Sequence, residues 1–143
     1  MRIVKKVLLF TVIMGLMGLT ACKKNKKQQK DIEKSIQEGN WKVTKFVDSG
    51  EDETYHFTSY TFTFDNSGTI TATNGSFSNN GTWSIKADDS DDDLDFNLFF
   101  SNVSNNFDEL NDDWDILSNS KTKIELIDRD DDGNHDYLTF EKN

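Results

Sequence analysis

The chain has 143 residues, with 16 basic and 26 acidic side chains, a net charge of −10, one cysteine and no proline. This length suits one domain, and the acidic balance argues against nucleic-acid binding, which needs a basic surface facing the phosphates. A single cysteine excludes a disulfide framework within the chain and a zinc site built from several cysteines.

Residues 1–21 have the layout of a bacterial lipoprotein signal peptide. A basic start over 2–6 precedes an apolar run over 7–19, which is shorter than the roughly 20 residues that span a membrane. The run ends in the segment LTAC at 19–22, which resembles a lipobox, so the Cys22 thiol is expected to take a diacylglyceryl group. An ordinary signal peptide with an incidental cysteine is the alternative, but the basic start, core length, small residues and sole cysteine together favour lipidation.

Residues 22–30 are predicted to be the lipidated cysteine and a basic tether. The segment KKNKKQQK at 23–30 has five lysines and no acid, and it has too little apolar surface to order itself. By resemblance to bacterial lipoproteins, two or three acyl chains such as palmitate anchor the protein stably, and Lys23 after the cysteine indicates the outer membrane, facing the periplasm. The domain at 31–143 has 8 basic and 26 acidic residues, hence a charge of −18.

This domain is predicted to begin with a short helix and to continue as strands. Ile32 and Ile36 share a helix face over 31–38, and Gly39 supplies a C-terminal stop. From residue 40 the apolar side chains recur at every second position, between turns rich in Gly, Asn and Asp. The pattern predicts eight strands, at 40–47, 58–65, 69–74, 81–87, 94–101, 113–118, 121–128 and 136–142. Residues 104–111 are expected to form a helical turn that caps one end of the sheet.

Eight antiparallel strands with one apolar face can close into an up-and-down barrel, which removes unpaired strand edges. A two-sheet sandwich is the alternative, but it normally needs longer crossover loops. The predicted fold class is therefore all-β, an eight-stranded antiparallel up-and-down barrel with a short N-terminal helix. The residues expected to face its interior include Trp41, Phe62, Phe64, Trp83, Phe96, Leu98, Trp114 and Phe140.

The predicted barrel resembles the lipocalins. The segment GNW at 39–41 matches their G-x-W motif at the entry to the first strand, and GTWS at 81–84 is similar to bacterial members. Over 31–143 the chain is thus similar to the lipocalin-like lipoproteins of Gram-negative bacteria. The resemblance implies that Trp41 closes the floor of the barrel and that a small hydrophobic ligand binds inside. The family usually places an arginine just beyond the last strand, against that tryptophan, where this chain has EKN at 141–143.

Two functions remain open from the sequence, because eight-stranded barrels lie at the boundary between filled and ligand-bearing interiors. The first is a non-catalytic carrier of a small apolar ligand. The second is a structural or interaction lipoprotein with a filled barrel, whose acidic surface meets a basic or cation-bridged partner. No catalytic residue is expected, because His56 and His135 accompany no recognisable nucleophile motif and the G-x-S-x-G motif is absent from the sequence.

A calcium loop is a further candidate, and calcium is the one cofactor that the sequence suggests. The segment at 128–133 matches the D-x-D-x-D-G opening of such loops, in which alternating oxygen ligands wrap a hard cation. The candidate ligands are Asp128, Asp130, Asp132 and Asp136. The twelfth position is Thr139 instead of glutamate and the flanks are predicted strands, so a solvated hairpin turn is the alternative.

Overall fold

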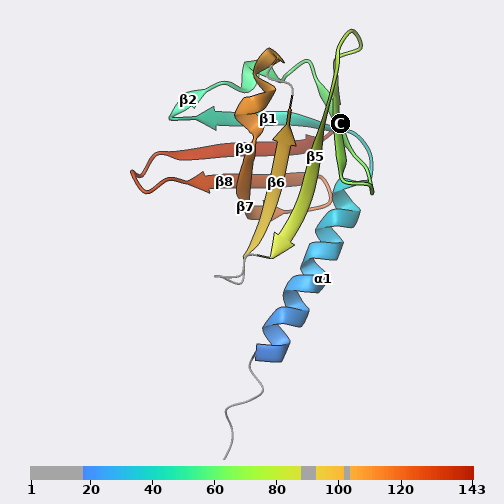
Figure 1. The fold of residues 1–143 in the computed structure, drawn as a ribbon, viewed down its shortest axis with the longest axis vertical. Coiled ribbons are helices and arrows are strands. Elements are labelled where there is room, and N and C mark those ends of the chain that lie inside the picture. Colours follow the sequence, from blue (N-terminus) through green and yellow to red (C-terminus); the bar gives the residue numbers. More distant parts are fainter. Residues whose placement is uncertain (1–17, 88–92, 102–103) are drawn as a thin grey trace, which may run out of the picture.

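The structure is a computed structural model, and it describes residues 18–87, 93–101 and 104–143 (Figure 1). Its elements are α1 (Gly18–Ile36), β1 (Trp41–Asp48), β2 (Glu51–Asp52), η1 (Thr54–His56), β3 (Thr61–Phe64), β4 (Thr69–Thr73), β5 (Ser78–Ala87), β6 (Leu94–Phe100), η2 (Ser104–Leu110), β7 (Asp112–Asn119), β8 (Lys123–Arg129) and β9 (His135–Lys142). The first 17 residues, which hold most of the predicted signal peptide, lie outside the described residues.

The strands form a closed antiparallel barrel, as predicted. Within the described part of the chain the strand order is β2-β1-β3-β4-β5-β6-β7-β8-β9, and β1 also pairs with β9. The closing pairs run from Trp41↔Lys142 to Val47↔Tyr137. The extra strand β2 only folds back on β1, through a turn at Ser49 and Gly50 that both have positive φ, as tight hairpin turns require. Eight strands therefore make the wall.

The barrel has two different ends. The end at which β1, β4, β6 and β8 finish also holds β2, η1 and η2, and we name it the distal end. The opposite end holds the C-terminal part of α1, which contacts β5, and we name it the helix end. Figure 1 shows η2 and β2 together at the top of the barrel, while α1 extends away below it.

Aromatic side chains fill the interior. The eight residues predicted to face inward are all buried, with Trp83 the most exposed at 7 %. Phe64 lies near the centre, with its ring centroid 5.5 Å from that of Phe140, 5.9 Å from that of Phe96 and 5.6 Å from that of Trp83. These contacts are edge to face, the arrangement that aromatic rings prefer.

The distal end is plugged by η2, the helical turn predicted over 104–111. Phe107 is fully buried, and its ring lies 4.9 Å from that of Tyr60, 5.0 Å from that of Phe100 and 5.5 Å from that of Phe57. Leu110 is also fully buried. The cap that the sequence predicted is thus built mainly on one phenylalanine.

The three tryptophans each bury their ring and donate the indole N–H to a backbone carbonyl. These bonds join Trp41 to Ile36 (2.8 Å), Trp83 to Asp65 (3.0 Å) and Trp114 to Leu110 (3.1 Å). The acceptors lie at the end of α1, in the β3–β4 turn and at the end of η2. Each tryptophan therefore satisfies its polar atom by holding a segment at a barrel end against the wall.

The two segments that carry the resemblance have structural roles here. The Lys142 ammonium lies 5.1 Å from the Trp41 ring centroid, so a lysine covers this tryptophan where the family usually has an arginine. A Cβ on Gly81 would collide with the Phe99 carbonyl oxygen, so glycine allows β5 and β6 to approach closely.

The helix is longer than the one predicted over 31–38. It takes in residues 23–30, which corrects the expectation of an unordered tether there. Lysine and glutamine are good helix formers, and the segment has no internal glycine or proline. Its C-terminal part is held by the burial of Ile32 and Ile36 and by a 2.8 Å hydrogen bond from Gln29 Nε2 to the Ile85 carbonyl oxygen. Docking at one end therefore lets the helix continue toward the N-terminus.

Phe140→Ala tests the filled interior. We expect it to lower the free energy of unfolding by about 3–5 kcal/mol, because a fully buried ring leaves a void that its neighbours cannot close. Denaturant unfolding measures the loss.

Phe77→Ala is the matched control, since that ring is 64 % exposed, and it should change stability by about 0.5 kcal/mol or less. A similarly small loss for Phe140→Ala would contradict a filled interior, because a ring that borders an existing cavity leaves little new void.

Candidate functional site

The interior residues predicted as ligand contacts instead contact one another. Rings from β3 and β9 meet across the barrel, with the Phe62 and Phe140 centroids 5.3 Å apart. The indole of Trp83 stacks on Phe96 at 6.1 Å. The side chains that the sequence brings inside therefore pack against one another across the barrel.

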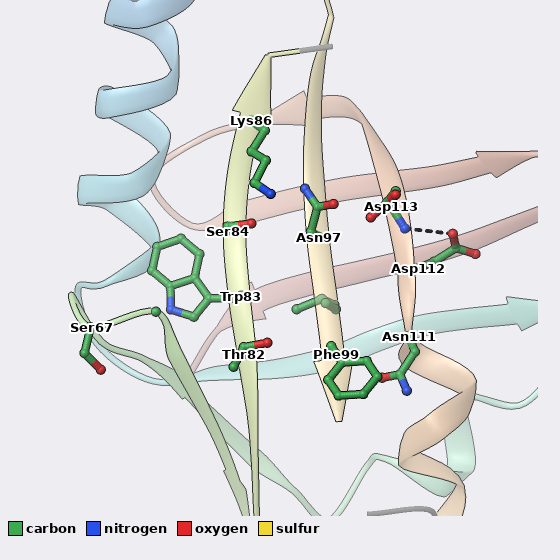
Figure 2. Close-up of a pocket in the computed structure, with 12 residues that line it drawn as sticks. Ser67, Thr82, Trp83, Ser84, Lys86, Asn97, Phe99, Asn111, Asp112 and Asp113 are labelled. Carbon is green, nitrogen blue, oxygen red and sulfur yellow. Dashed lines mark hydrogen bonds between the residues drawn. The ribbon is translucent and has the colours of Figure 1, made fainter. Parts of the chain in front are cut away.

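A groove lies on the outside of the barrel, over β5, β6 and the start of β7 (Figure 2). It has a volume of about 640 Å³ and is open to solvent. Figure 2 shows its side chains in rows along the strands, and its main polar and aromatic lining consists of Thr82, Ser84, Lys86, Asn97, Phe99, Asn111, Asp112 and Asp113.

The groove combines one flat apolar surface with polar groups. The Phe99 side chain is 57 % exposed. Beside it on β6, the Asn97 amide nitrogen is inaccessible to solvent and has no hydrogen-bond partner among the described residues. Asn111 is already engaged, because its side chain bonds both the N–H and the carbonyl of Phe100 and so joins η2 to β6. The other polar groups of the groove are on β5, on Asn97 and at the start of β7, where Asp112 accepts the Asp113 N–H at 2.7 Å.

Three of the four predicted calcium ligands converge at the distal end. Carboxylate oxygens of Asp128, Asp130 and Asp136 all lie within 4.8 Å of one another. They converge because β8 and β9 form a hairpin in which Asp128 pairs with Asp136. Asp132 does not join them, because its carboxylate accepts the backbone N–H of Asn134 at 2.9 Å. The segment forms a hairpin turn, and we name its three converging carboxylates, Asp128, Asp130 and Asp136, the acidic hairpin. Calcium binding there stays a prediction.

The charges of the acidic hairpin repel one another. Burial raises the pKa of Asp128 above its usual value, and the carboxylates of Asp112 and Asp130 raise it further. Burial also raises the pKa of Asp136, against the hydrogen bond that it accepts from the Ser49 N–H, and the nearby Asp48 adds to the increase. Asp112 lines the outer groove as well, so groove and acidic hairpin form one continuous surface.

The predicted lipidation residue lies in α1, but its surroundings are not described. The backbone of Cys22 is helical, and side chains are described from residue 24 onward. Among the described residues, no helix has the length and apolar character needed to cross a membrane.

No sequence motif indicates the groove or two of the carboxylates near the acidic hairpin. Asn97 and Phe99 alternate with buried residues along β6, so they lie on the outer face of the barrel. Asp48 and Asp112 come from β1 and β7, far in sequence from the D-x-D-x-D-G segment. The barrel register, which no local pattern specifies, brings these residues together.

Comparison with known proteins supports the fold. No protein-family model and no curated protein matches the chain. A crystal structure of a DUF4847 family protein from Bacteroides vulgatus ATCC 8482 is similar, with a TM-score of 0.51 and 20% sequence identity, and the match covers 78% of this chain and 97% of that chain. At this identity the similarity supports the barrel fold alone. The lipocalin-like family is not identified by these comparisons.

Asp128→Asn tests the repulsion in the acidic hairpin. A pKa raised in the folded state means that the folded protein holds the proton more tightly, so stability falls as the pH rises through that pKa. We expect Asp128→Asn to raise the free energy of unfolding at pH 7 by on the order of 1 kcal/mol, and the gain to vanish below about pH 4. Thermal unfolding across pH measures it, with the exposed Asp131→Asn as control.

The same variants test the calcium expectation. If an ion bridges the three carboxylates, calcium raises the melting temperature of the wild type and Asp128→Asn removes that increase. A melting temperature that calcium does not change would leave the segment as a solvated turn. A loss of stability in Asp128→Asn at neutral pH would contradict the repulsion itself.

Proposed function

We propose that the chain is a non-catalytic lipoprotein of the bacterial cell envelope, whose filled barrel binds a basic segment of a partner protein on its acidic outer surface. The observation that carries this proposal is the continuity of the outer groove with the acidic hairpin through Asp112. Groove and carboxylates together offer an elongated site, with an aromatic contact at Phe99 and several negative charges beyond it.

The packed aromatic interior favours a binding site on the outer surface over a ligand site inside the barrel. A carrier of lipocalin type needs space within the wall, whereas here the rings of Phe64 and Phe140 meet 5.5 Å apart in the middle. An apolar ligand would have to displace such rings, and losing the packing of one buried phenylalanine costs about 3–5 kcal/mol. Binding of a small apolar ligand inside is the weaker alternative.

The charge of the domain supports a cationic partner. Residues 31–143 have 8 basic and 26 acidic side chains, and such a field speeds the approach of an oppositely charged partner. Burial raises the pKa values of Asp128 and Asp136, and neighbouring carboxylates raise them further. Lysine or arginine side chains of a partner would relieve that repulsion.

Lipid anchoring at Cys22 would orient the binding surface relative to the membrane. From Cys22 to Ile36 the helix rises about 20 Å, at 1.5 Å per residue. With an acylated Cys22 in the membrane, α1 would hold the barrel by its helix end, and the distal end would face away from the lipid. The lysines at 23–30 would lie nearest the membrane, where anionic headgroups attract them.

Site-specific photo-crosslinking tests the proposed binding surface. With p-benzoylphenylalanine in place of Phe99, we expect cross-links to a basic protein in the native envelope. Replacing Asp112 and Asp113 with asparagine should lower the cross-linking yield by about fivefold or more, because the partner loses its charge contacts.

The matched control removes the same charge from the other end, where Asp31 and Glu38 are both exposed. Asp31→Asn with Glu38→Gln should leave the yield unchanged. Equal yields from both pairs of variants would contradict the proposal, as would an apolar molecule that co-purifies with the barrel in native mass spectrometry.

Cys22→Ser tests the proposed anchor. Without the thiol no diacylglyceryl group can be added, so we expect the protein to leave the outer-membrane fraction and to lose the mass of its acyl chains. Membrane fractionation and intact-mass measurement read both changes, with Ser35→Ala in the same helix as control. Unchanged membrane retention of Cys22→Ser would show that the chain is held by something else.

A further inference from the structure

A second group of metal-ligand side chains lies at the distal end, apart from the acidic hairpin. Glu53 precedes the short helix η1 as its N-cap residue, and His56 ends that helix. In a 3-10 helix, side chains three residues apart lie above one another. The Glu53 carboxylate and the His56 imidazole therefore face the same side, with Oε2 of the glutamate 3.7 Å from Nδ1 of the histidine.

A third side chain reaches this pair from a remote part of the chain. Glu109 lies on η2, and its Oε2 atom is 3.5 Å from His56 Nδ1. One donor atom from each of Glu53, His56 and Glu109 lies within 4.8 Å of the other two. All three side chains are partly buried, with 21 % to 30 % of their surface exposed.

The Glu109 carboxylate is poorly compensated in this position. Its Oε2 atom is inaccessible to solvent and has no hydrogen-bond partner among the described residues. A buried carboxylate oxygen beside a second carboxylate calls for a cation between them.

We propose that Glu53, His56 and Glu109 bind one divalent transition-metal ion, of which Zn²⁺ is the best fit. An imidazole nitrogen with two carboxylates is a donor set that suits zinc. Four-coordinate zinc has bonds of about 2.0–2.1 Å, which place neighbouring donors about 3.3 Å apart. The observed separations of 3.5 and 3.7 Å need to shorten by only a few tenths of an ångström. Two carboxylates and a neutral imidazole also balance the charge of the ion.

Asn106 contributes to the same site. Its amide nitrogen lies 2.9 Å from Nδ1 and 3.3 Å from Nε2 of His56. The lone-pair directions of the two ring nitrogens diverge, so one amide nitrogen at similar distances from both is not aligned with either. Asn105 and Asn106 both have positive φ, a conformation that costs energy in residues other than glycine. Rotation of the Asn106 amide would turn its oxygen toward the ion, as a fourth ligand or as an acceptor for bound water.

This site differs in chemistry from the acidic hairpin. The acidic hairpin offers oxygen donors alone, which suit calcium, whereas the imidazole favours zinc and related ions. The ion would also join η1 to η2, next to the contact between Phe57, which follows η1, and Phe107, whose ring centroids lie 5.5 Å apart. It would thus fix the cap over the distal end.

Metal titration of the full chain tests this site. The protein carries Cys22→Ser, which removes the thiol as a competing ligand, and is freed of metal with a chelator. Co²⁺ is then added in the presence of excess Ca²⁺, which occupies sites made of oxygen donors alone. We expect one equivalent of Co²⁺ to give visible d–d absorption of the intensity typical of four- or five-coordinate sites, and Zn²⁺ to displace it.

The variants assign the ligands. His56→Ala should abolish the absorption, and Glu109→Gln, which keeps the shape of the side chain, should weaken Zn²⁺ binding by about tenfold or more. Circular dichroism and thermal unfolding confirm that each variant is folded. His135→Ala and Asp130→Asn are matched controls from the β8–β9 hairpin and should leave binding unchanged. A Zn²⁺ dissociation constant weaker than about 1 mM, or equal binding by the wild type and folded Glu109→Gln, would overturn the proposal.

Discussion

In the middle of the barrel, Phe64 from β3 contacts Trp83 from β5, Phe96 from β6 and Phe140 from β9. Edge-to-face aromatic pairs add about 0.5–1.5 kcal/mol each beyond their buried area. These contacts join strands that are not neighbours in the sheet, so they hold opposite walls together. An eight-stranded barrel is just wide enough for side chains to fill it, and here large rings do so. The proposed binding surfaces accordingly lie on the outside and at the distal end.

The ends depend on the same residues as the core. A filled barrel still exposes the edges of its outermost rings unless other segments cover them. The tryptophans hold those segments in place, because each buried indole N–H needs an acceptor. Each donates to a backbone carbonyl in a helix end or a turn. Trp41 in this way links the barrel to α1, and Trp114 links it to η2. The tryptophans that pack in the core therefore also fix the segments that cover the barrel ends.

Much of this architecture was predictable from the sequence. Alternation of apolar and polar residues predicted every strand of the wall, because each strand buries one face. The length of α1 was not predictable, because lysine and glutamine also suit a disordered tether. The helix is held by contacts that form only in the folded barrel, among them the bond from Gln29 to β5 and the burial of Ile32 and Ile36. Of the four calcium ligands predicted from the D-x-D-x-D-G segment and Asp136, three do converge. Glu109, however, meets His56 only through the folded barrel, across 53 positions of sequence, and no motif records that contact.

The charged side chains that converge at the distal end are not the residues that hold the fold together. Within the described residues, both groups of converging metal-ligand side chains lie at the distal end, one on η1 and η2 and one on β8 and β9. Carboxylates that raise the pKa values of their neighbours destabilise the folded state at neutral pH. The wall and the aromatic core would fold as well with amides at those positions. Under the two proposals, ions or basic side chains that bind at this end, opposite the helix that leads to Cys22, would offset the repulsion.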